Sequence, residues 1–226
     1  HWRRACLVDV AARSAYLSCV GLPAFGAVDM SADAKTLAIY DAKAADYAKI
    51  VVSKAEHKSL IGFVEDLPKG AHVLDLGCGP GHYAAEMLKR GCTVDAVDGS
   101  AAMVALAQAV EGLNATQALF DDLDAVETYD GVWASFSLLH APRKKLPQHL
   151  GQIKRALKPS GVFHIGMKLG DAEARDALGR AYTYVSEPEL LELLTDAGFE
   201  PYDIFKGEGT GLSGSIDKFI LVRAHG

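Results

Sequence analysis

The feature that most constrains the fold of this chain is a glycine-rich turn that directly follows a short apolar run. The run at 73–76 contains Asp75, the turn is Gly77-Cys78-Gly79-Pro80-Gly81, and a helical pattern follows at 83–90. This order predicts a buried strand, a tight turn and a helix. Glycines let a ligand approach the backbone closely, and the free N–H groups of a helix start favour a negative ligand group. The sequence therefore predicts a ligand-binding strand–turn–helix unit.

A second acid supports this prediction. The apolar run at 92–97 predicts the next strand, and it ends at Asp98, seventeen residues after Gly81. An acid at the end of this strand is suited to accept hydrogen bonds from ribose hydroxyls. Asp98 could instead cap the helix expected at 100–110, but Ser100 can fill that role. The two acids and the turn together predict a site for a nucleoside-containing cofactor.

The spacing of the glycines distinguishes between cofactors. The dinucleotide fingerprint is G-x-G-x-x-G, whereas this turn is G-x-G-x-G with Asp75 two residues before it. A carboxylate at this place repels a pyrophosphate but suits an ammonium group. The stretch resembles motif I of the class I S-adenosylmethionine-dependent methyltransferases, and the resemblance extends over residues 36–223. It implies S-adenosyl-L-methionine as the cofactor. The alternatives are a nicotinamide-dependent oxidoreductase and a non-catalytic S-adenosylmethionine-binding regulatory protein.

The resemblance also implies which residues bind the cofactor. Asp75 and the glycine turn are expected to hold the methionine portion, and Asp98 the ribose. Either Asp121 or Asp122 is expected to bind the adenine amino group, with a slight preference for Asp121, although a solvated acidic turn is the alternative. The full expected set is Tyr40, Asp75, Gly77, Cys78, Gly79, Gly81, Asp98, Gly99, Ser100, Met103, Asp121, Asp122, Leu123 and Ser135. Met103 is expected to flank the adenine, and a role as a core residue explains it nearly as well.

A further set of residues is expected to face the methyl acceptor: His140, Lys168, Arg180 and Tyr182. His140 is a candidate general base because a neutral imidazole titrates near pH 7, but a structural role is the stronger alternative. Arg180 could bind an anionic acceptor through two hydrogen bonds, or form a surface ion pair. Tyr40 and Tyr47 resemble the helix that covers the cofactor in small-molecule methyltransferases, although an aromatic packing stripe explains Tyr47 equally well.

The arrangement of apolar patterns predicts an α/β fold. Strands are expected at 72–76, 93–97, 115–119, 130–135, 161–167, 201–206 and 216–223, and helices within 36–63 and at 81–90, 100–110, 144–157, 172–178 and 187–197. Alternating strands and helices predict a parallel sheet covered on both faces. The last two strands have no helix between them and should form an antiparallel hairpin. The resemblance implies a Rossmann-like sheet with strand order 3-2-1-4-5-7-6.

The net charge and the cysteine spacing argue against two kinds of binding site. The net charge of −6 argues against a nucleic-acid-binding surface, and the four cysteines show no metal-ligand spacing. A reduced, cytoplasmic setting and a small-molecule acceptor are therefore expected, with no metal and no membrane partner. Residues 1–29 are expected to be an extension outside a methyltransferase domain at 30–226. The segment around His140 resembles uncharacterised bacterial methyltransferases related to the tellurite-resistance type. The sequence predicts neither the acceptor's identity nor the oligomeric state.

Overall fold

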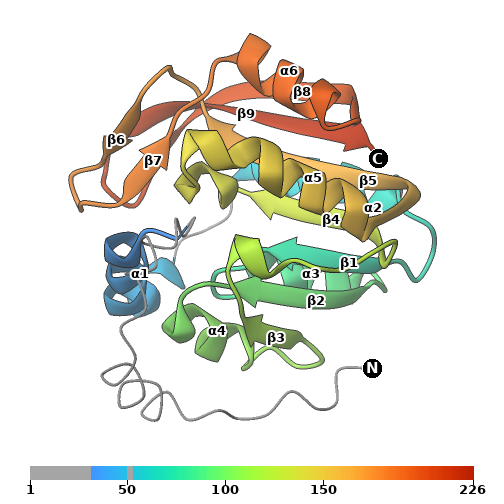
Figure 1. Ribbon diagram of the computed structural model, residues 1–226. Helices are drawn as coiled ribbons and strands as arrows, with labels where there is room; N and C mark the ends of the chain where they lie inside the picture. Colours follow the sequence, from blue (N-terminus) through green and yellow to red (C-terminus); the bar gives the residue numbers. More distant parts are fainter. Residues whose placement is uncertain (1–31, 50–52) are drawn as a thin grey trace, which may run out of the picture. The chain divides into compact units, whose positions relative to one another are not determined.

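The computed structural model describes residues 32–49 and 53–226. Its main sheet contains β1 (His72–Leu76), β2 (Thr93–Asp98), β3 (Asn114–Gln117), β4 (Tyr129–Ser135), β5 (Leu157–Lys168), β8 (Glu200–Thr210) and β9 (Ile216–His225). The helices are α1 (Ala34–Tyr47), α2 (Lys54–Glu65), α3 (His82–Lys89), α4 (Ala101–Ala107), α5 (Leu146–Ala156) and α6 (Glu187–Asp196). The strand order is β3-β2-β1-β4-β5-β9-β8 (Figure 1).

The sheet has the predicted topology. Strands β1 to β5 run parallel, and β9 runs antiparallel to both β5 and β8. With β8 and β9 counted as the sixth and seventh strands, this is the expected order 3-2-1-4-5-7-6. The chain reverses its direction of winding at β1, so the carboxyl ends of β1 and β4 mark the place where such sheets bind ligands.

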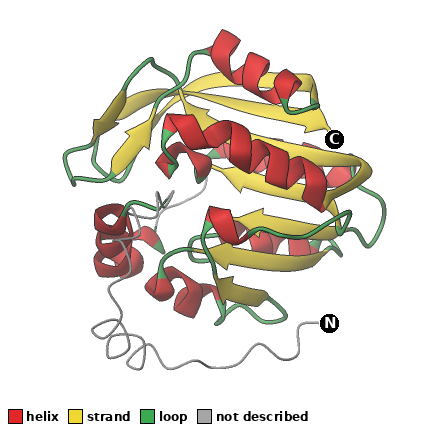
Figure 2. Ribbon diagram, viewed as in Figure 1, coloured by secondary structure: helices red, strands yellow, loops and turns green. Residues whose placement is uncertain are grey.

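Helices cover both faces of the sheet (Figure 2). On one face, α5 and α6 pack with alternate residues of β1 and β4, including Leu74 and Val132. On the other face, α2, α3 and α4 pack on the residues that point the opposite way, including Val73 and Trp133. Successive side chains of a strand alternate between faces, so a run that is apolar throughout is buried on both sides. This explains why β1 reads as a nearly continuous apolar run.

Two sequence predictions about the elements were inaccurate. The helix expected at 172–178 is absent, and the segment contains β6 (Glu173–Arg175), which pairs with β7 (Ala181–Thr183). Its alanines and charged residues favour a helix locally. However, the Glu173 carboxylate accepts hydrogen bonds from Arg143 N and Thr183 Oγ1, so tertiary contacts hold the segment as a hairpin. The helical pattern at 36–63 is divided between α1 and α2.

The expected extension at 1–29 and its boundary at Met30 lie outside the described residues. Among the residues that the structure describes, none of the helices has the length and apolar character required to cross a bilayer.

Candidate active site

The glycine turn between β1 and α3 has the geometry that its sequence predicts. Gly77 has a φ of +79°, and a Cβ atom built on it would lie 2.3 Å from Ser137 Cβ. The N–H groups of Gly77 and Cys78 both donate to the carbonyl oxygen of Val97, at 2.8 and 2.9 Å. Gly81, with a φ of +86°, is the N-cap residue of α3. The turn is thus held against β2, and only glycine fits at position 77.

Asp98 lies beside this turn at the end of β2. Its two carboxylate oxygens accept hydrogen bonds from Gly79 N at 2.9 Å and Ser100 N at 2.8 Å. Ser100 itself caps α4, as expected, by accepting a hydrogen bond from Met103 N. Burial raises the pKa of Asp98, while the two N–H groups oppose this shift. Each carboxylate oxygen accepts several hydrogen bonds, so capacity remains for a pair of ribose hydroxyls.

Asp75 is buried beneath the turn, with an exposed fraction of 1%. One carboxylate oxygen, Oδ2, has no hydrogen-bond partner among the described residues. Burial, and then the nearby charge of Asp98, raises the pKa of Asp75 to about 8, although a hydrogen bond from the backbone of Ala84 opposes the shift. A buried carboxyl that has no cation nearby is unfavourable in its ionised form, and an ammonium group bound beside it would stabilise that form. The free carboxyl oxygen of Asp75, as a hydrogen-bond acceptor, therefore fits the cationic end of S-adenosylmethionine.

A pocket of about 720 Å³ opens in front of the turn. Its lining includes the apolar residues Met103, Leu119 and Phe120 as well as Gly77, Gly79 and the carboxylate of Asp98. An adenosine group with an amino-acid tail likewise combines apolar and polar parts. The residues present thus fit the cofactor that the sequence implies.

The expected cofactor residues divide into three groups. Those that line the pocket are Tyr40, Gly77, Gly79, Asp98, Gly99, Met103 and Ser135. Asp75, Cys78, Gly81 and Ser100 do not line it, and the interactions described above place them in or beside the turn and at the start of α4. Asp121, Asp122 and Leu123 also fall outside the lining. These three lie at a short 3₁₀ helix (Phe120–Asp122) and at the residue that follows it.

The side chains of the two candidate adenine acids have partners elsewhere. Asp122 Oδ2 accepts a hydrogen bond from Leu119 N at 2.8 Å, and Asp121 Oδ1 accepts one from Gln148 at 3.1 Å. The adjacent residues Ala118, Leu119 and Phe120 line the pocket instead. The adenine contact from Asp121 or Asp122 therefore stays a prediction.

The end of β4 contributes two residues that the sequence analysis did not assign to the cofactor. Phe136 has a φ of +54°, which is unusual for a bulky residue, and its N–H donates to Gly166 O at 3.0 Å. Ser137 is buried, and its Oγ has no hydrogen-bond partner among the described residues. Both residues line the cofactor pocket. A strained backbone that is held by its surroundings is a common feature of functional sites, but no sequence pattern announces it.

A second pocket, of about 980 Å³, shares the side chains of Tyr40, Tyr47 and Phe136 with the first. We call it the acceptor pocket. Lys168, Arg180 and Tyr182 line it, while His140 lines the cofactor pocket next to it. The four residues expected to face the acceptor lie together around Tyr182. Its ring centroid is 4.6 Å from that of His140, 4.0 Å from Lys168 Nζ and 5.3 Å from Arg180 Cζ.

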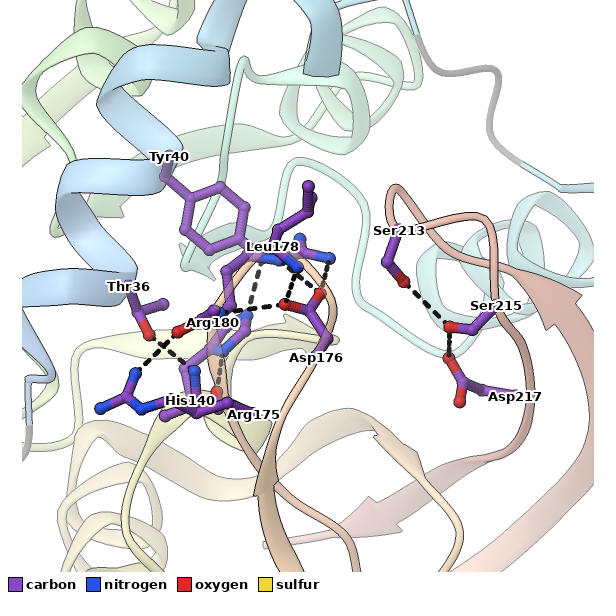
Figure 3. A network of polar contacts seen from close by, with 12 residues as sticks. Thr36, Tyr40, His140, Arg175, Asp176, Leu178, Arg180, Ser213, Ser215 and Asp217 are labelled. Carbon is purple, nitrogen blue, oxygen red and sulfur yellow. Dashed lines mark hydrogen bonds and ion pairs between the residues drawn. The ribbon is translucent and has the colours of Figure 1, made fainter.

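Figure 3 shows a polar network whose residues include Tyr40, which lines both pockets, His140 of the cofactor pocket and Arg180 of the acceptor pocket. His140 Nδ1 lies 2.7 Å from the carbonyl oxygen of Ala181, so Nδ1 carries the proton and Nε2 is the acceptor. The Tyr40 hydroxyl therefore donates to His140 Nε2, at 2.7 Å, and accepts from Arg180 Nη1 at 3.0 Å. Burial lowers the pKa of His140 to about 4, more than its backbone hydrogen bond raises it. The imidazole is neutral at pH 7, and both of its nitrogens have partners.

Helix α1 is fastened to the β6–β7 hairpin by further contacts. Arg175 donates two hydrogen bonds to the Asp33 carboxylate, at 2.8 and 2.9 Å, and Ala181 N donates to Thr36 Oγ1 at 2.8 Å. Arg175 is the main cause of the lowered pKa of Asp33. Asp33, Thr36 and Tyr40 all line the cofactor pocket, so these contacts hold α1 against the site. The covering role that the sequence predicts for the helix stays a prediction.

Comparisons with known proteins agree with this geometry. A family model described as "Methyltransferase domain" matches residues 73–161. No curated protein has a sequence that matches the chain. A Burkholderia thailandensis 1,6-didemethyltoxoflavin-N1-methyltransferase, solved with 1,6-didemethyltoxoflavin and S-adenosylhomocysteine bound, is 25% identical with a TM-score of 0.66, covering 85% of this chain and 87% of its own.

Two further solved structures are similar to the chain in fold. An S-adenosylmethionine-dependent methyltransferase from Methanosarcina mazei is 18% identical with a TM-score of 0.64, covering 78% of this chain and 98% of its own. An S-adenosylmethionine-dependent methyltransferase from Mesorhizobium loti is 20% identical with a TM-score of 0.65, and the match covers 77% of this chain and 99% of the Mesorhizobium loti chain.

Proposed function

Because the chain is a class I S-adenosylmethionine-dependent methyltransferase, we propose that it methylates a small aromatic molecule bound in the acceptor pocket. The observation that carries this proposal is the second pocket, which shares Tyr40, Tyr47 and Phe136 with the cofactor pocket. Its walls also include Tyr182 and Phe219, so five aromatic side chains surround the space. Flat apolar walls favour a ring system over a flexible chain.

The proposed acceptor class also agrees with the charge of the molecule and with one relative. A nucleic-acid substrate is disfavoured because the net charge is −6, whereas surfaces that bind nucleic acids are basic. The Burkholderia thailandensis methyltransferase holds a small molecule, 1,6-didemethyltoxoflavin, together with S-adenosylhomocysteine. Cys78 and Cys92 are free and buried, which fits the reduced, cytoplasmic setting that the sequence predicts.

When bound, S-adenosylmethionine supplies an activated methyl group on a sulfonium. The work of this chain's residues is to align the acceptor with that methyl group and to exclude water. Alignment of reacting groups can contribute roughly 7–11 kcal/mol to a rate enhancement. Tyr40 is suited to this role because it lines both pockets and its hydroxyl is fixed by His140 and Arg180.

His140 serves in this proposal as a positioning residue and not as the general base. Its Nε2 accepts the hydrogen bond from Tyr40, and its pKa of about 4 makes it a weak base at pH 7. The arrangement therefore supports the structural alternative that the sequence left open. Arg180 forms an ion pair with Asp176, but the pair is buried and not on the surface.

The test is formation of S-adenosylhomocysteine during incubation of the full chain with S-adenosylmethionine and a panel of small heteroaromatic molecules. The proposal predicts acceptor-dependent formation, lost in the Asp98→Ala variant. Titration with NAD provides the control, because an oxidoreductase would bind it. Cofactor binding without turnover on any acceptor would favour the regulatory alternative. Efficient methylation of DNA, RNA or protein without small-molecule turnover would contradict the proposed acceptor class.

A further inference from the structure

The charged residues that line the acceptor pocket differ in whether their charge is already compensated. Lys168 Nζ lies 2.7 Å from Asp217 Oδ2 and 4.0 Å from the centroid of the Tyr182 ring. Ser215 holds the same carboxylate oxygen through a hydrogen bond of 3.1 Å (Figure 3). The ammonium group of Lys168 is therefore paired within the protein.

The second cation of the pocket is paired more completely. Arg180 donates to Asp176 Oδ2 from Nε at 3.0 Å and from Nη2 at 2.6 Å, and its Nη1 donates to the Tyr40 hydroxyl. The exposed fractions of the Arg180 and Asp176 side chains are 2% and 5%. An anionic acceptor could use this guanidinium only by displacing Asp176, which would leave a carboxylate buried without its cation.

Glu56 lines the same pocket from the first turn of α2, and its partners are neutral. Oε1 accepts a hydrogen bond from the Tyr83 hydroxyl at 2.5 Å, and Oε2 accepts one from Ser53 N at 3.1 Å. None of the described lysines, arginines and histidines forms an ion pair with it. Glu208, on β8, also lines the pocket and has neither a hydrogen bond nor an ion pair from its side chain to another described residue.

We propose that the acceptor pocket selects a molecule that carries an ammonium group, and that Glu56 is the specificity-determining residue that binds this group. The inference rests on the proposed function, since it assigns the acceptor to this pocket. Both cations of the pocket are paired with acids, whereas Glu56 and Glu208 are not paired with cations. Glu56 is also held in a fixed orientation, so little side-chain entropy is lost when it binds a donor. A carboxylate-bearing acceptor would be repelled.

The test uses three indole probes of similar size that differ in charge: 3-(2-aminoethyl)indole, 3-(2-hydroxyethyl)indole and indole-3-propionate. Dissociation constants are measured by calorimetry with the full chain saturated with S-adenosylhomocysteine, so no turnover is needed. The amine should bind most tightly, and the propionate about tenfold or more weakly than the amine, as expected for one charge-assisted contact.

The matched variants are Glu56→Gln and Glu65→Gln, both on α2. Glutamine at position 56 keeps the capping box with Ser53, so the helix start is preserved while the charge is removed. This change should reduce the preference for the amine over the propionate by about tenfold, with the affinity for S-adenosylhomocysteine unchanged within about twofold. Glu65 is exposed and lies outside the pocket, so its variant should behave as the parent protein.

Three results would overturn the proposal: a propionate that binds as tightly as the amine, an amine preference that Glu56→Gln leaves unchanged, or an equal loss in the Glu65→Gln variant. A chain that forms S-adenosylhomocysteine with some acceptor yet gives one of these results would retain the proposed function. Failure of all three probes to bind at millimolar concentration would contradict the selection of an ammonium group by Glu56, whereas formation of S-adenosylhomocysteine with another small aromatic acceptor would still support the proposed function.

Discussion

The cofactor pocket and the acceptor pocket adjoin each other but are built differently. The polar end of the cofactor pocket is largely backbone at the carboxyl ends of β1, β2 and β4, held by hydrogen bonds such as Gly79 N to Asp98. The acceptor pocket is lined by side chains from α1, α2, β5, β7, β8 and β9, which lie far apart in the sequence. Backbone geometry leaves little freedom to vary, whereas side chains can be exchanged. The difference suggests how one fold can keep its cofactor while changing its acceptor.

The largest expected effect comes from Gly77→Ala, which tests the rigidity of the cofactor pocket. The added Cβ would meet Ser137 Cβ at 2.3 Å, and the φ of +79° adds backbone strain. We expect the free energy of unfolding to fall by about 2–4 kcal/mol and cofactor binding to weaken.

Gly112→Ala is the matched control for this change, because Gly112 has a φ of +80° but nothing within 4 Å of the added Cβ. It should cost only about 1 kcal/mol. Chemical denaturation compares the two variants. Equal losses would mean that the close approach of Ser137 does not constrain the turn.

A second prediction distinguishes Asp98, the expected ribose-binding residue, from Asp122, a candidate for binding adenine. Asp98→Ala should weaken S-adenosylmethionine binding by about tenfold or more, since charge-assisted hydrogen bonds contribute about 1.5–3 kcal/mol each. Asp122→Ala should have a smaller effect, because the Asp122 side chain is directed to Leu119 N and lies outside the pocket lining. Calorimetric titration measures both. A larger loss of cofactor affinity in Asp122→Ala than in Asp98→Ala would support the adenine contact that the sequence predicts, and would contradict the assignment of Asp98 as the main polar contact.

A third prediction concerns Tyr40, the side chain shared by both pockets. Tyr40→Phe keeps the ring but removes the hydroxyl that donates to His140 Nε2 and accepts from Arg180 Nη1. We expect kcat/KM for the acceptor to fall by about tenfold, as for a polar contact left unpaired in a buried site. The dissociation constant of the cofactor should change by less than about threefold. A steady-state analysis that finds loss only in cofactor binding would assign Tyr40 to the cofactor pocket alone.

The smallest expected effect is the release of a proton from Asp75 when the cofactor binds. The pKa of this carboxyl is raised from 3.8 to about 8, so the folded protein retains a proton at pH 7 that the unfolded chain has lost. The contribution of Asp75 to stability is therefore present at low pH and is lost as the pH rises from 3.8 to about 8. A bound ammonium group favours the ionised carboxyl, so cofactor binding at pH 7 should release a fraction of a proton.

Calorimetry in phosphate and Tris buffers measures this release, because the two buffers differ in ionisation enthalpy. Asp75→Asn should abolish it. Proton uptake on binding, or the same release in Asp75→Asn, would show that Asp75 is not coupled to the cofactor.

The cofactor pocket could be predicted from the sequence more completely than the acceptor pocket, because its residues lie close together in the chain. The turn at 77–81 and Asp98 belong to one local strand–turn–helix–strand unit, so their spacing alone predicts their geometry. Glu56 and Phe219 carry no local signal, because only the packing of α2 and β9 brings them to one pocket. A helix is predicted at 172–178, where the structure has β6, for a related reason, since the local helical propensity of this segment is overridden by contacts from Arg143 and Thr183.

The most direct test of the account is a crystal structure of the full chain with S-adenosylhomocysteine bound. The account predicts the ribose hydroxyls within hydrogen-bond distance of Asp98, the base between Met103 and Leu119, and the amino-acid tail over Gly77. The sulfur should face the acceptor pocket past Tyr40. A ligand bound elsewhere, or bound with its ribose away from Asp98, would contradict the assignment of the cofactor pocket and the acceptor pocket that depends on it.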